Sequence, residues 1–188
     1  ETEINPPSKK GKVRAQIAQM LMHALETGRI KALIARAADF YGPGINNSMF
    51  NEAIVKNLKA GKKANWFCSL KFKHNFTYTP DAAKATALLG NTESAYGQVW
   101  HLPTAPAKTM QEWIELTAGE LSVKSKTMVV TKSLMGVLGL FNPLMREMQE
   151  MLYQYDRDYE FDSSKFETVF NIKPTPANKA VKEITEAS

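Results

Sequence analysis

Cysteine is almost absent from this chain of 188 residues, which contains Cys68 and no other. A disulfide bond within the chain is therefore excluded, and such a composition is typical of proteins from reducing compartments, so we expect a cytoplasmic protein. No run of residues approaches the roughly 18 to 20 apolar positions that a helix needs to cross a bilayer. The sequence accordingly predicts no membrane-spanning helix and no membrane partner.

Several signatures of catalysis and of cofactor binding are also missing. The chain has no P-loop, no zinc-ligand spacing and no Ser-His-Asp order. Gly42 and Gly44 follow an apolar stretch, but the third glycine of a G-x-G-x-x-G turn is absent, so this chain carries no dinucleotide fingerprint of its own. Three histidines, which are His23, His74 and His101, are widely separated in sequence. We therefore predict no metal site.

The charge is mildly basic, with 24 Lys and Arg against 19 Asp and Glu and a formal net charge of +5. This excess permits an anionic ligand without requiring one. The basic residues are mostly scattered among acidic ones, so we do not expect a nucleic-acid partner. Hydrophobic residues make up 44% of the chain, which is enough to build a buried core and excludes a disordered chain.

Apolar periodicity and turn residues predict an α/β fold. From Val13 to Glu26 apolar residues recur at steps of three and four, which predicts an amphipathic helix with Ser8 as its N-cap and Gly28 at its end. Residues 30–40 predict a short buried strand that stops at the sequence "YGPG". A helix, a tight turn and an apolar strand in succession are typical of an α/β layer.

The same reading continues to the C-terminus. Thr109 and Glu112 are three residues apart and predict a capping box at the start of a helix. Pro143 is expected to kink or divide a long helical region. Helices are predicted at 46–62, 79–91, 109–121, 133–155, 162–170 and 175–187, and strands at 65–70, 72–79, 97–103 and 126–131.

The first turn of the first predicted helix is unusually basic. It contains Lys9, Lys10 and Lys12, and Arg14 follows one turn after Lys10. A helix N-terminus carries partial positive charge and favours acidic residues, so these cations are a poor choice for stability alone. Two interpretations remain open, which are a solvated basic end and an anion site formed by the helix start together with its cations.

An alternating aromatic strip follows in the predicted strand at 72–79. Phe72, His74, Phe76 and Tyr78 would lie on one face of that strand. This pattern indicates either a packed aromatic face or the wall of a pocket in which His74 is the polar group.

Four motifs occur in order along the chain. They are "NPPSKKGKVRAQIAQML", "ALIARAADFYGPG", "FTYTPDAAKATALL" and "GQVWHLP". Together they resemble the second half of an extended short-chain dehydrogenase/reductase of the NAD-dependent epimerase/dehydratase type. In that family a Y-G-x-x-K helix, a strand ending R-x-x-N-x-Y-G-P and an F-x-Y-V-D-D-x-A-x-A segment appear in this order. The resemblance covers nearly the whole chain.

The resemblance implies a fold and a domain organisation. The chain would be the C-terminal part of a Rossmann-type parallel sheet plus a smaller mixed α/β substrate-binding lobe. Residues 1–45 would end the dinucleotide-binding domain, and residues 46–188 would mainly form the lobe, with about 76–90 returning to the Rossmann domain. The missing N-terminal Rossmann half would be a partner of this piece. The helix from Val13 to Glu26 would be a candidate surface for a homodimer.

The resemblance also implies a site that holds NAD or NADP and a small-molecule substrate. Lys10 and Arg14 stand where the family has its acid/base Tyr and its ribose-holding Lys. The backbone at Ala37 and Ala38 would line the nicotinamide site. The residues expected to contact substrate are Asp39, Asn47, His74 and Arg157.

The departures from the family pattern bear on the chemistry. Arg14 can offer donors to ribose hydroxyls, although its planar head needs a different geometry. Lys10 can act as a base only if burial and a neighbouring Arg lower its pKa. Asp39 replaces the family Asn, and His74 replaces an Arg that often holds a nucleotide-sugar phosphate, so affinity for a diphosphate is reduced.

Two functions follow from the resemblance. The first is the C-terminal, substrate-binding portion of an NAD(P)-dependent oxidoreductase or epimerase-like enzyme. The alternative is a non-catalytic NAD(P)-binding sensor or scaffold on the same fold, which the replaced Tyr/Lys pair favours.

Overall fold

The first helix forms where the sequence predicts it. The computed structural model describes residues 4–141, 149 and 151–187, and α1 comprises Lys9–Glu26. The Ser8 hydroxyl accepts a hydrogen bond from the Gly11 amide at 3.1 Å and satisfies a donor that the helix leaves free. Gly28 follows the helix with a φ of +67°, a left-handed conformation that favours glycine. The predicted N-cap and the predicted end are therefore confirmed.

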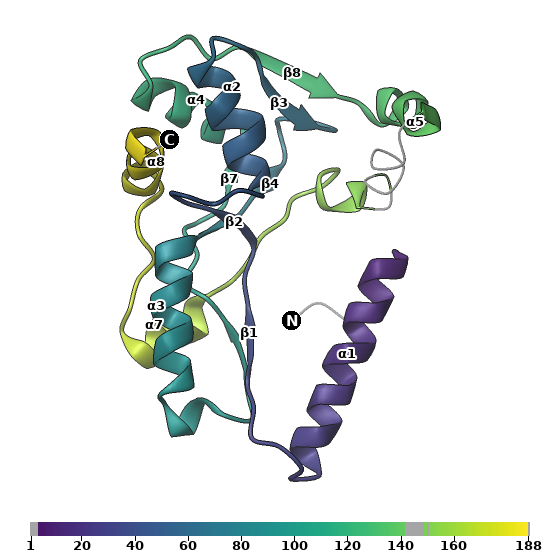
Figure 1. The fold of residues 1–188 in the computed structure, drawn as a ribbon, viewed down its shortest axis with the longest axis vertical. Helices are drawn as coiled ribbons and strands as arrows, with labels where there is room; N and C mark the ends of the chain where they lie inside the picture. The colour runs from purple at the N-terminus through teal and green to yellow at the C-terminus, as the bar shows by residue number, and fades with distance from the viewer. Residues whose placement is uncertain (1–3, 142–148, 150, 188) are drawn as a thin grey trace.

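The apolar stripe of α1, which we define as Val13, Ile17 and Met20, is not buried. These side chains are 54%, 59% and 73% exposed, and the helix has no buried residue. In Figure 1 α1 stands to one side of the rest of the fold, with β1 as the labelled strand next to it. The helical periodicity was read correctly, but no element in the described part of the chain covers the apolar side.

Within the described residues, the strands pair as four two-stranded ladders. Three of the ladders are parallel and one is antiparallel. The parallel pairs are β1 (Ile34–Arg36) with β6 (Val99–His101), β2 (Asp39–Tyr41) with β5 (Phe76–Tyr78), and β3 (Ala64–Phe67) with β8 (Thr127–Val130). The antiparallel pair is β4 (Lys73–His74) with β7 (Lys108–Thr109). Parallel pairing between strands far apart in the chain confirms the mixed α/β class.

The prediction of one buried strand at 30–40 is wrong in two respects. The segment forms two strands, β1 and β2, which belong to different ladders, because the chain bends at Ala38, whose amide donates to the Thr77 hydroxyl at 2.9 Å. Neither strand is fully buried: Ala35 in β1 and Phe40 in β2 are exposed. Ile30 lies before the strand and is exposed as well.

The predicted strand at 72–79 is also divided. Asn75 lies between β4 and β5 and belongs to neither strand. Its side chain forms hydrogen bonds with two other segments of the chain, at Ala105 and at Phe161. The predicted alternation does not hold: His74, Phe76 and Tyr78 are buried, but Asn75 and Thr77 between them are buried as well. The sequence therefore identified a buried stretch, but neither its burial on both faces nor the break in the backbone.

The helices are close to their predicted positions. The helix predicted at 46–62 begins with a π-helical turn, η1 (Asn51–Val55), and continues as α2 (Lys56–Lys59) to Gly61, which has a φ of +68°. α4 begins with the predicted capping box of Thr109 and Glu112. The remaining elements are α3 (Thr79–Gly90), η2 (Glu93–Ala95), α4 (Met110–Glu120), α5 (Lys132–Phe141), η3 (Leu152–Gln154), α7 (Ser164–Phe170) and α8 (Ala177–Ala187).

The helix predicted over 133–155 is described only in part. α5 comprises Lys132–Phe141, the residues directly after it lie outside the described ones, and Leu152–Gln154 form the 3-10 turn η3 instead of the predicted helix end. Pro143, the predicted kink, lies outside the described residues.

Two hydrophobic cores hold the fold together. The upper core in Figure 1 joins η1, β3, α4 and α8 around Tyr41, Phe76 and Trp113. The lower core lies between β6, α3 and α7, around Trp100 and Phe166. β1 and β6 therefore belong to a different packed unit from the lobe above them, and the chain between β1 and β2 runs from one unit to the other.

Gly42 allows β2 to end close to the start of α3. A Cβ atom added at Gly42 would lie 1.8 Å from the Thr79 hydroxyl oxygen, which is far inside contact distance. We expect Gly42→Ala to lower the free energy of unfolding by about 1–3 kcal/mol, because Thr79 must move away from the Tyr41 carbonyl. Urea unfolding would measure this.

Gly119→Ala is the matched control for this substitution. Gly119 lies in α4, and nothing is within 4 Å of its added Cβ. Alanine there should stabilise the helix by about 0.5–1 kcal/mol. Equal effects of the two substitutions would contradict the steric argument at Gly42.

Candidate functional site

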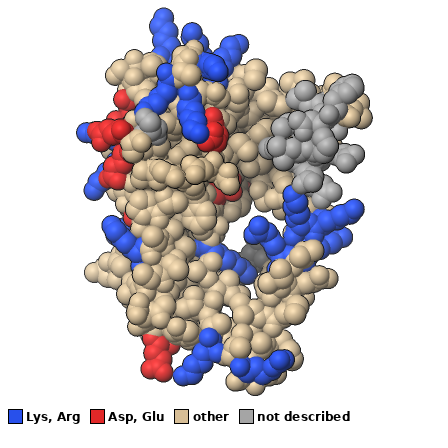
Figure 2. All heavy atoms as spheres, in the orientation of Figure 1, with Lys and Arg blue, Asp and Glu red and all other residues tan. Residues whose placement is uncertain are grey.

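A cavity of about 810 Å³ lies between α1 and the segment that begins with η3. Its polar side chains are Asn5, Arg14 from α1, Arg36 from the end of β1, Tyr153 from η3, and Arg157 just after it. The rest of its lining is Ile4, Pro6, Pro7, Gly11, Ala15 and Ala18. We call it the arginine cavity. Figure 2 shows a hollow at this level of the molecule with Lys and Arg side chains gathered along its rim.

Among the described residues that line the arginine cavity, the charged groups are three guanidiniums, and none is a carboxylate. Among the described residues Arg14 has no ion-pair partner, while Arg157 is held through its Nε by Asp156. Guanidinium groups stay charged at any physiological pH, so the cavity has a persistent positive potential.

Asp156 positions the segment that supplies Arg157 and Tyr153. Its Oδ1 accepts from Arg157 Nε at 2.7 Å, and its Oδ2 accepts from Lys132 Nζ at 2.6 Å. The hydrogen bonds from Arg157 and Lys132 lower the pKa of the Asp156 carboxyl below its ordinary value. Asp156 in turn raises the pKa of Arg157. The carboxylate is therefore ionised near neutral pH and fixes one edge of the guanidinium.

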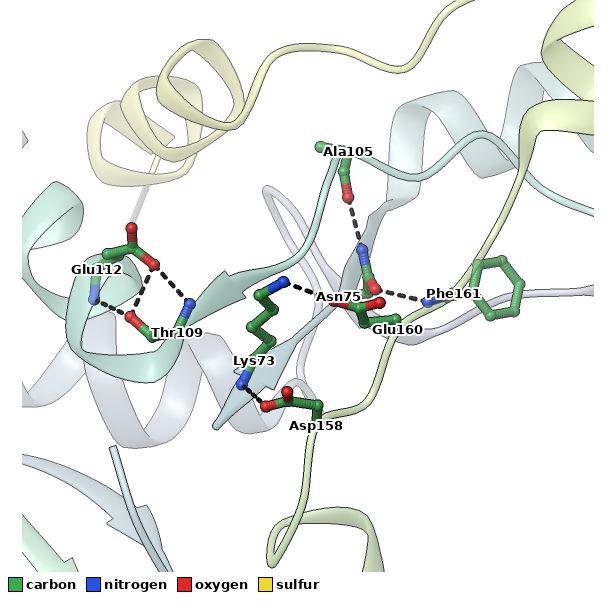
Figure 3. Close-up of polar contacts among 8 residues, drawn as sticks. All are labelled: Lys73, Asn75, Ala105, Thr109, Glu112, Asp158, Glu160 and Phe161. Carbon is green, nitrogen blue, oxygen red and sulfur yellow. Dashed lines mark hydrogen bonds and ion pairs between the residues drawn. The ribbon is translucent and has the colours of Figure 1, made fainter. Parts of the chain in front are cut away.

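Asn75 fastens the same segment to the upper lobe. Figure 3 shows its buried side chain between two backbone groups: Nδ2 donates to the Ala105 carbonyl and Oδ1 accepts from the Phe161 amide, each at 2.7 Å. Lys73 adds two exposed contacts, since its amide donates to Asp158 and its ammonium group to Glu160, both at 2.8 Å. The segment that carries Arg157 is thus held on both sides.

His74 lies in an aromatic cluster next to this segment. Its ring stacks on Tyr155 with centroids 5.6 Å apart and contacts Tyr159 at 4.9 Å. His74 Nε2 and Asp39 Oδ2 are 2.9 Å apart. Because the His74 side chain is only 3% exposed, it packs as part of the aromatic face and also holds a carboxylate. Of the two interpretations of the aromatic strip, the packed aromatic face is therefore the one observed, and His74 contacts Asp39 rather than the arginine cavity.

The tyrosines around Asp39 stay protonated over the physiological range. Burial raises the pKa of Tyr155, and the Asp39 carboxylate raises it further. The same two causes raise the pKa of Tyr159 to about 12. Both phenols therefore remain neutral beside Asp39.

The structure brings some of the predicted site residues together and leaves others apart. Arg14 and Arg157 share the arginine cavity, while Asp39 of β2 and His74 of β4 pair with each other outside its lining. Lys10 is exposed on the first turn of α1, outside the cavity lining, and Asn47 is exposed in the turn before η1. Ala38 is buried and its neighbour Ala37 packs on the lower core.

Sequence reasoning missed two residues of the cavity. Arg36 belongs to the motif "ALIARAADFYGPG". Its position near the end of an apolar stretch indicated the end of a strand and gave no sign of a binding role. Tyr153 lies within η3, a 3-10 turn in a stretch that was expected to be helix, and nothing local distinguishes it from the other tyrosines near the C-terminus. Only the approach of this segment to α1 brings Tyr153 beside the arginines.

A second cavity of about 630 Å³ lies on the other side of Arg36. Its lining has mixed charge: Lys165 and Arg36 are balanced by Glu160 and Asp162. Lys165 is already engaged, since it donates to the Val99 carbonyl at 3.1 Å and lies 4.2 Å from the centroid of the Trp100 ring. Arg36 therefore lines both cavities: the arginine cavity, and the second cavity, whose lining contains acidic as well as basic side chains.

Two kinds of site receive no support from the described residues. They contain no group of three or more His, Cys, Asp or Glu side chains arranged to hold a metal ion. None of the helices in the described ranges is long and apolar enough to cross a membrane.

The fold is similar to that of several enzymes of known structure. dTDP-glucose 4,6-dehydratase from Bacillus anthracis, in complex with NAD, superposes with a TM-score of 0.77 at 17% identity, over 100% of this chain and 54% of that protein. UDP-glucose 4-epimerase from Thermus thermophilus, in complex with NAD, gives a TM-score of 0.74 at 12% identity, over 97% of this chain and 54% of that protein. UDP-glucuronic acid 4-epimerase from Bacillus cereus, in complex with NAD, gives a TM-score of 0.73 at 16% identity, over 97% of this chain and 52% of that protein.

These comparisons establish the fold. The chain has the mixed α/β architecture of the C-terminal portion of a Rossmann-like epimerase/dehydratase and spans about half the length of these proteins. No family model and no curated protein sequence matches it.

Proposed function

We propose that this chain is the C-terminal, substrate-binding portion of an NAD(P)-dependent oxidoreductase of the epimerase/dehydratase type. The observation that carries the proposal is the arginine cavity. It joins Arg14, at the position of the family's ribose-holding Lys, to Arg36 and to the segment that carries Tyr153 and Arg157. The shared fold with three enzymes solved in complex with NAD supports it.

The two cores support a division of this kind. The lower unit, with β1, β6, α3 and α7, would complete the dinucleotide-binding domain, and the rest of residues 46–188 would form the substrate lobe. The segments returning to the lower unit would then extend beyond 76–90. The exposed apolar stripe of α1 would be covered by the N-terminal half of the same protein.

Each cavity residue has a role suited to its chemistry. Arg14 donates hydrogen bonds to the ribose hydroxyls of the nicotinamide half, and Arg157 binds substrate. Tyr153 contributes a phenol to the cavity, so its hydroxyl would give its proton to the carbonyl oxygen of the substrate as that carbonyl is reduced, and the phenolate that remains would take the proton back from the substrate alcohol in the reverse direction. The bound cofactor supplies hydride transfer.

Full-length protein with NAD or NADP provides the test. A panel of sugars, hydroxy acids and aromatic carbonyl compounds is screened for turnover by nicotinamide absorbance. We expect Tyr153→Phe to lower turnover at least about 100-fold while cofactor affinity is retained. Tyr96→Phe is the matched control, because Tyr96 is exposed and its hydroxyl bonds the Gly90 carbonyl in the lower unit. Turnover that survives in Tyr153→Phe and is lost in Lys10→Ala would assign the proton transfer to Lys10 instead.

A non-catalytic NAD(P)-binding sensor is the second candidate. The observation that favours it is the exposure of Lys10 outside the cavity, since a proton-transfer group must reach the substrate. This candidate predicts that calorimetry detects cofactor binding by the full-length protein but that no compound of the panel exchanges hydride. Absence of cofactor binding would contradict both functions.

A further inference from the structure

We infer that a buried chain of hydroxyl groups centred on Thr77 positions the substrate lobe against the lower unit, which would hold the cofactor. The inference rests on the proposed function for the roles of the two units, and it makes Thr77 a positioning residue of the proposed reaction. The hydroxyls belong to Thr77, Thr104 and Ser163, which come from three separate segments and are all buried.

The hydroxyl chain lies where the polypeptide passes between the two units. Ala38 connects β1 of the lower unit to β2 of the upper one, and Thr77 lies in β5 between two residues of the upper core. Leu102 belongs to the lower core, and Thr104 follows it on the way to β7. Ser163 directly precedes α7, which packs in the lower core. Hydrogen bonds among these segments therefore join the units at their boundary.

The hydrogen bonds of the hydroxyl chain run in one direction. The Ala38 amide donates to the Thr77 hydroxyl oxygen at 2.9 Å, and the Thr104 hydroxyl donates to the Leu102 carbonyl at 2.9 Å. The two hydroxyl oxygens are 2.8 Å apart. Because the single hydroxyl proton of Thr104 is engaged by Leu102, Thr77 must donate to Thr104. Each hydroxyl therefore donates once and accepts once, and the chain is continuous from Ala38 to Leu102.

Ser163 extends the hydroxyl chain to the C-terminal segment. Its hydroxyl oxygen accepts a hydrogen bond from the Thr104 amide at 3.1 Å. Figure 3 shows a second connection close to it in sequence, in which the Asn75 side chain joins the Ala105 carbonyl to the Phe161 amide. The linker after β6 and the segment before α7 are therefore joined twice.

The placement of one unit on the other bears directly on the proposed reaction. The lower unit would hold the cofactor and the upper lobe the substrate, so the distance between the reacting atoms depends on the junction. A displacement of about 1 Å can cost about 100-fold in rate. A buried polar network whose members are all paired is rigid. The hydroxyl chain would therefore set this distance, although Thr77, Thr104 and Ser163 do not line the arginine cavity.

Full-length protein carrying Thr77→Val tests the inference, with NAD(P) and the compound that turns over in the panel above. Valine has nearly the shape of threonine but no hydroxyl, so the Ala38 amide loses its acceptor and Thr104 loses its donor. We expect kcat to fall at least about tenfold while KM for substrate and cofactor stays within about threefold, because each unit keeps its own binding residues. Thr77→Ser keeps the hydroxyl and should restore kcat to within about twofold of the wild type.

Thr117→Val is the matched control. Thr117 is 0% exposed, as is Thr77, but its hydroxyl donates to the Trp113 carbonyl within α4 and joins no separate segments. This substitution removes one buried hydroxyl and should leave kcat within about twofold of the wild type. Circular dichroism checks that the variants fold. Thr104→Val removes the next hydroxyl of the chain and is the second variant, with the same expected loss of kcat as Thr77→Val.

Hydrogen exchange tests the junction independently of catalysis. In Thr77→Val the Thr104 amide should exchange at least about tenfold faster relative to the amides of α8, which report on the upper core. The acceptor of that amide, Ser163, is not altered by the substitution, so the acceleration measures coupling along the chain. Thr117→Val should leave the same ratio within about twofold.

The outcomes separate this inference from the proposed function. The inference is overturned if Thr77→Val lowers kcat no more than Thr117→Val does, if Thr77→Ser does not restore kcat, or if exchange at the Thr104 amide is unchanged. Turnover by the wild type upholds the proposed oxidoreductase in each of these cases. If neither the wild type nor any variant turns over, but Thr77→Val accelerates exchange at Thr104, the junction is upheld and the proposed oxidoreductase is refuted.

Discussion

Trp113→Ala is expected to lower the free energy of unfolding by about 3–5 kcal/mol, as for other large aromatic residues removed from a core. Trp113 is 0% exposed at the centre of the upper core. Its ring lies 5.4–5.6 Å from the ring centroids of Tyr41, Phe50 and Phe76, in edge-to-face contacts. Alanine would remove all three contacts and leave a cavity that these rigid neighbours cannot close.

The Trp113 indole also links the core to the candidate site. Its Nε1 donates to the His74 carbonyl at 2.9 Å, and the His74 ring pairs with Asp39. Trp113→Phe keeps most of the packing but leaves that carbonyl without its donor, so we expect a smaller loss of about 1–3 kcal/mol. Guanidinium unfolding followed by far-ultraviolet circular dichroism measures both variants.

The exposed Val169 provides the control for this comparison. Val169→Ala, at 59% exposure on α7, should change stability by less than about 0.5 kcal/mol. A Trp113→Ala protein that unfolds within 1 kcal/mol of the wild type would contradict the packing described above.

Asn75→Ala should cost about 2–4 kcal/mol and loosen the segment that carries Arg157. Without the Asn75 side-chain amide, the Ala105 carbonyl and the Phe161 backbone amide lose their hydrogen-bond partner. Each buried group left without a partner costs about 1–3 kcal/mol of stability. Since Phe161 follows Arg157 by four residues, the effect should reach the arginine cavity. Urea unfolding measures the loss of global stability, and hydrogen exchange at the Phe161 amide measures the local loosening of the segment.

Lys73→Ala is the control on the same segment. Its ammonium group bonds Glu160 at the surface, where an ion pair contributes at most about 1 kcal/mol. We expect little change in stability and unchanged protection of the Phe161 amide. If Asn75→Ala leaves that protection unchanged too, then Asn75 does not hold the segment, and the positions of Tyr153 and Arg157 must depend on Asp156 alone.

Local signals in the sequence predicted the helices well. Ser8 before α1, and Thr109 with Glu112 before α4, satisfy helix donors with side chains only a few residues away. Such interactions are complete within one turn of chain, so their pattern can be read without knowing the fold. Gly28 and Gly61 end helices for the same local reason.

The strands were predicted less well because their limits depend on distant partners. The bend at Ala38 follows from Thr77, and the break at Asn75 follows from Ala105 and Phe161. A run of apolar and aromatic residues indicates a buried extended chain, but the ladder to which each residue belongs is decided by hydrogen bonds to other segments. The π-helical turn in η1 likewise had no signal that we recognised.

By itself the sequence determined the α/β class, the helix ends and the basic first turn of α1, since each depends on neighbours along the chain. Only the tertiary structure decided which cations share a cavity. Lys10 and Arg14 are one turn apart, yet Arg14 lines the cavity and Lys10 does not. Arg36 and Tyr153 join it from positions more than 100 residues apart, because β1 and η3 approach α1 in space. Convergence of this kind is set by packing and hydrogen bonds between remote segments, which residue spacing does not encode.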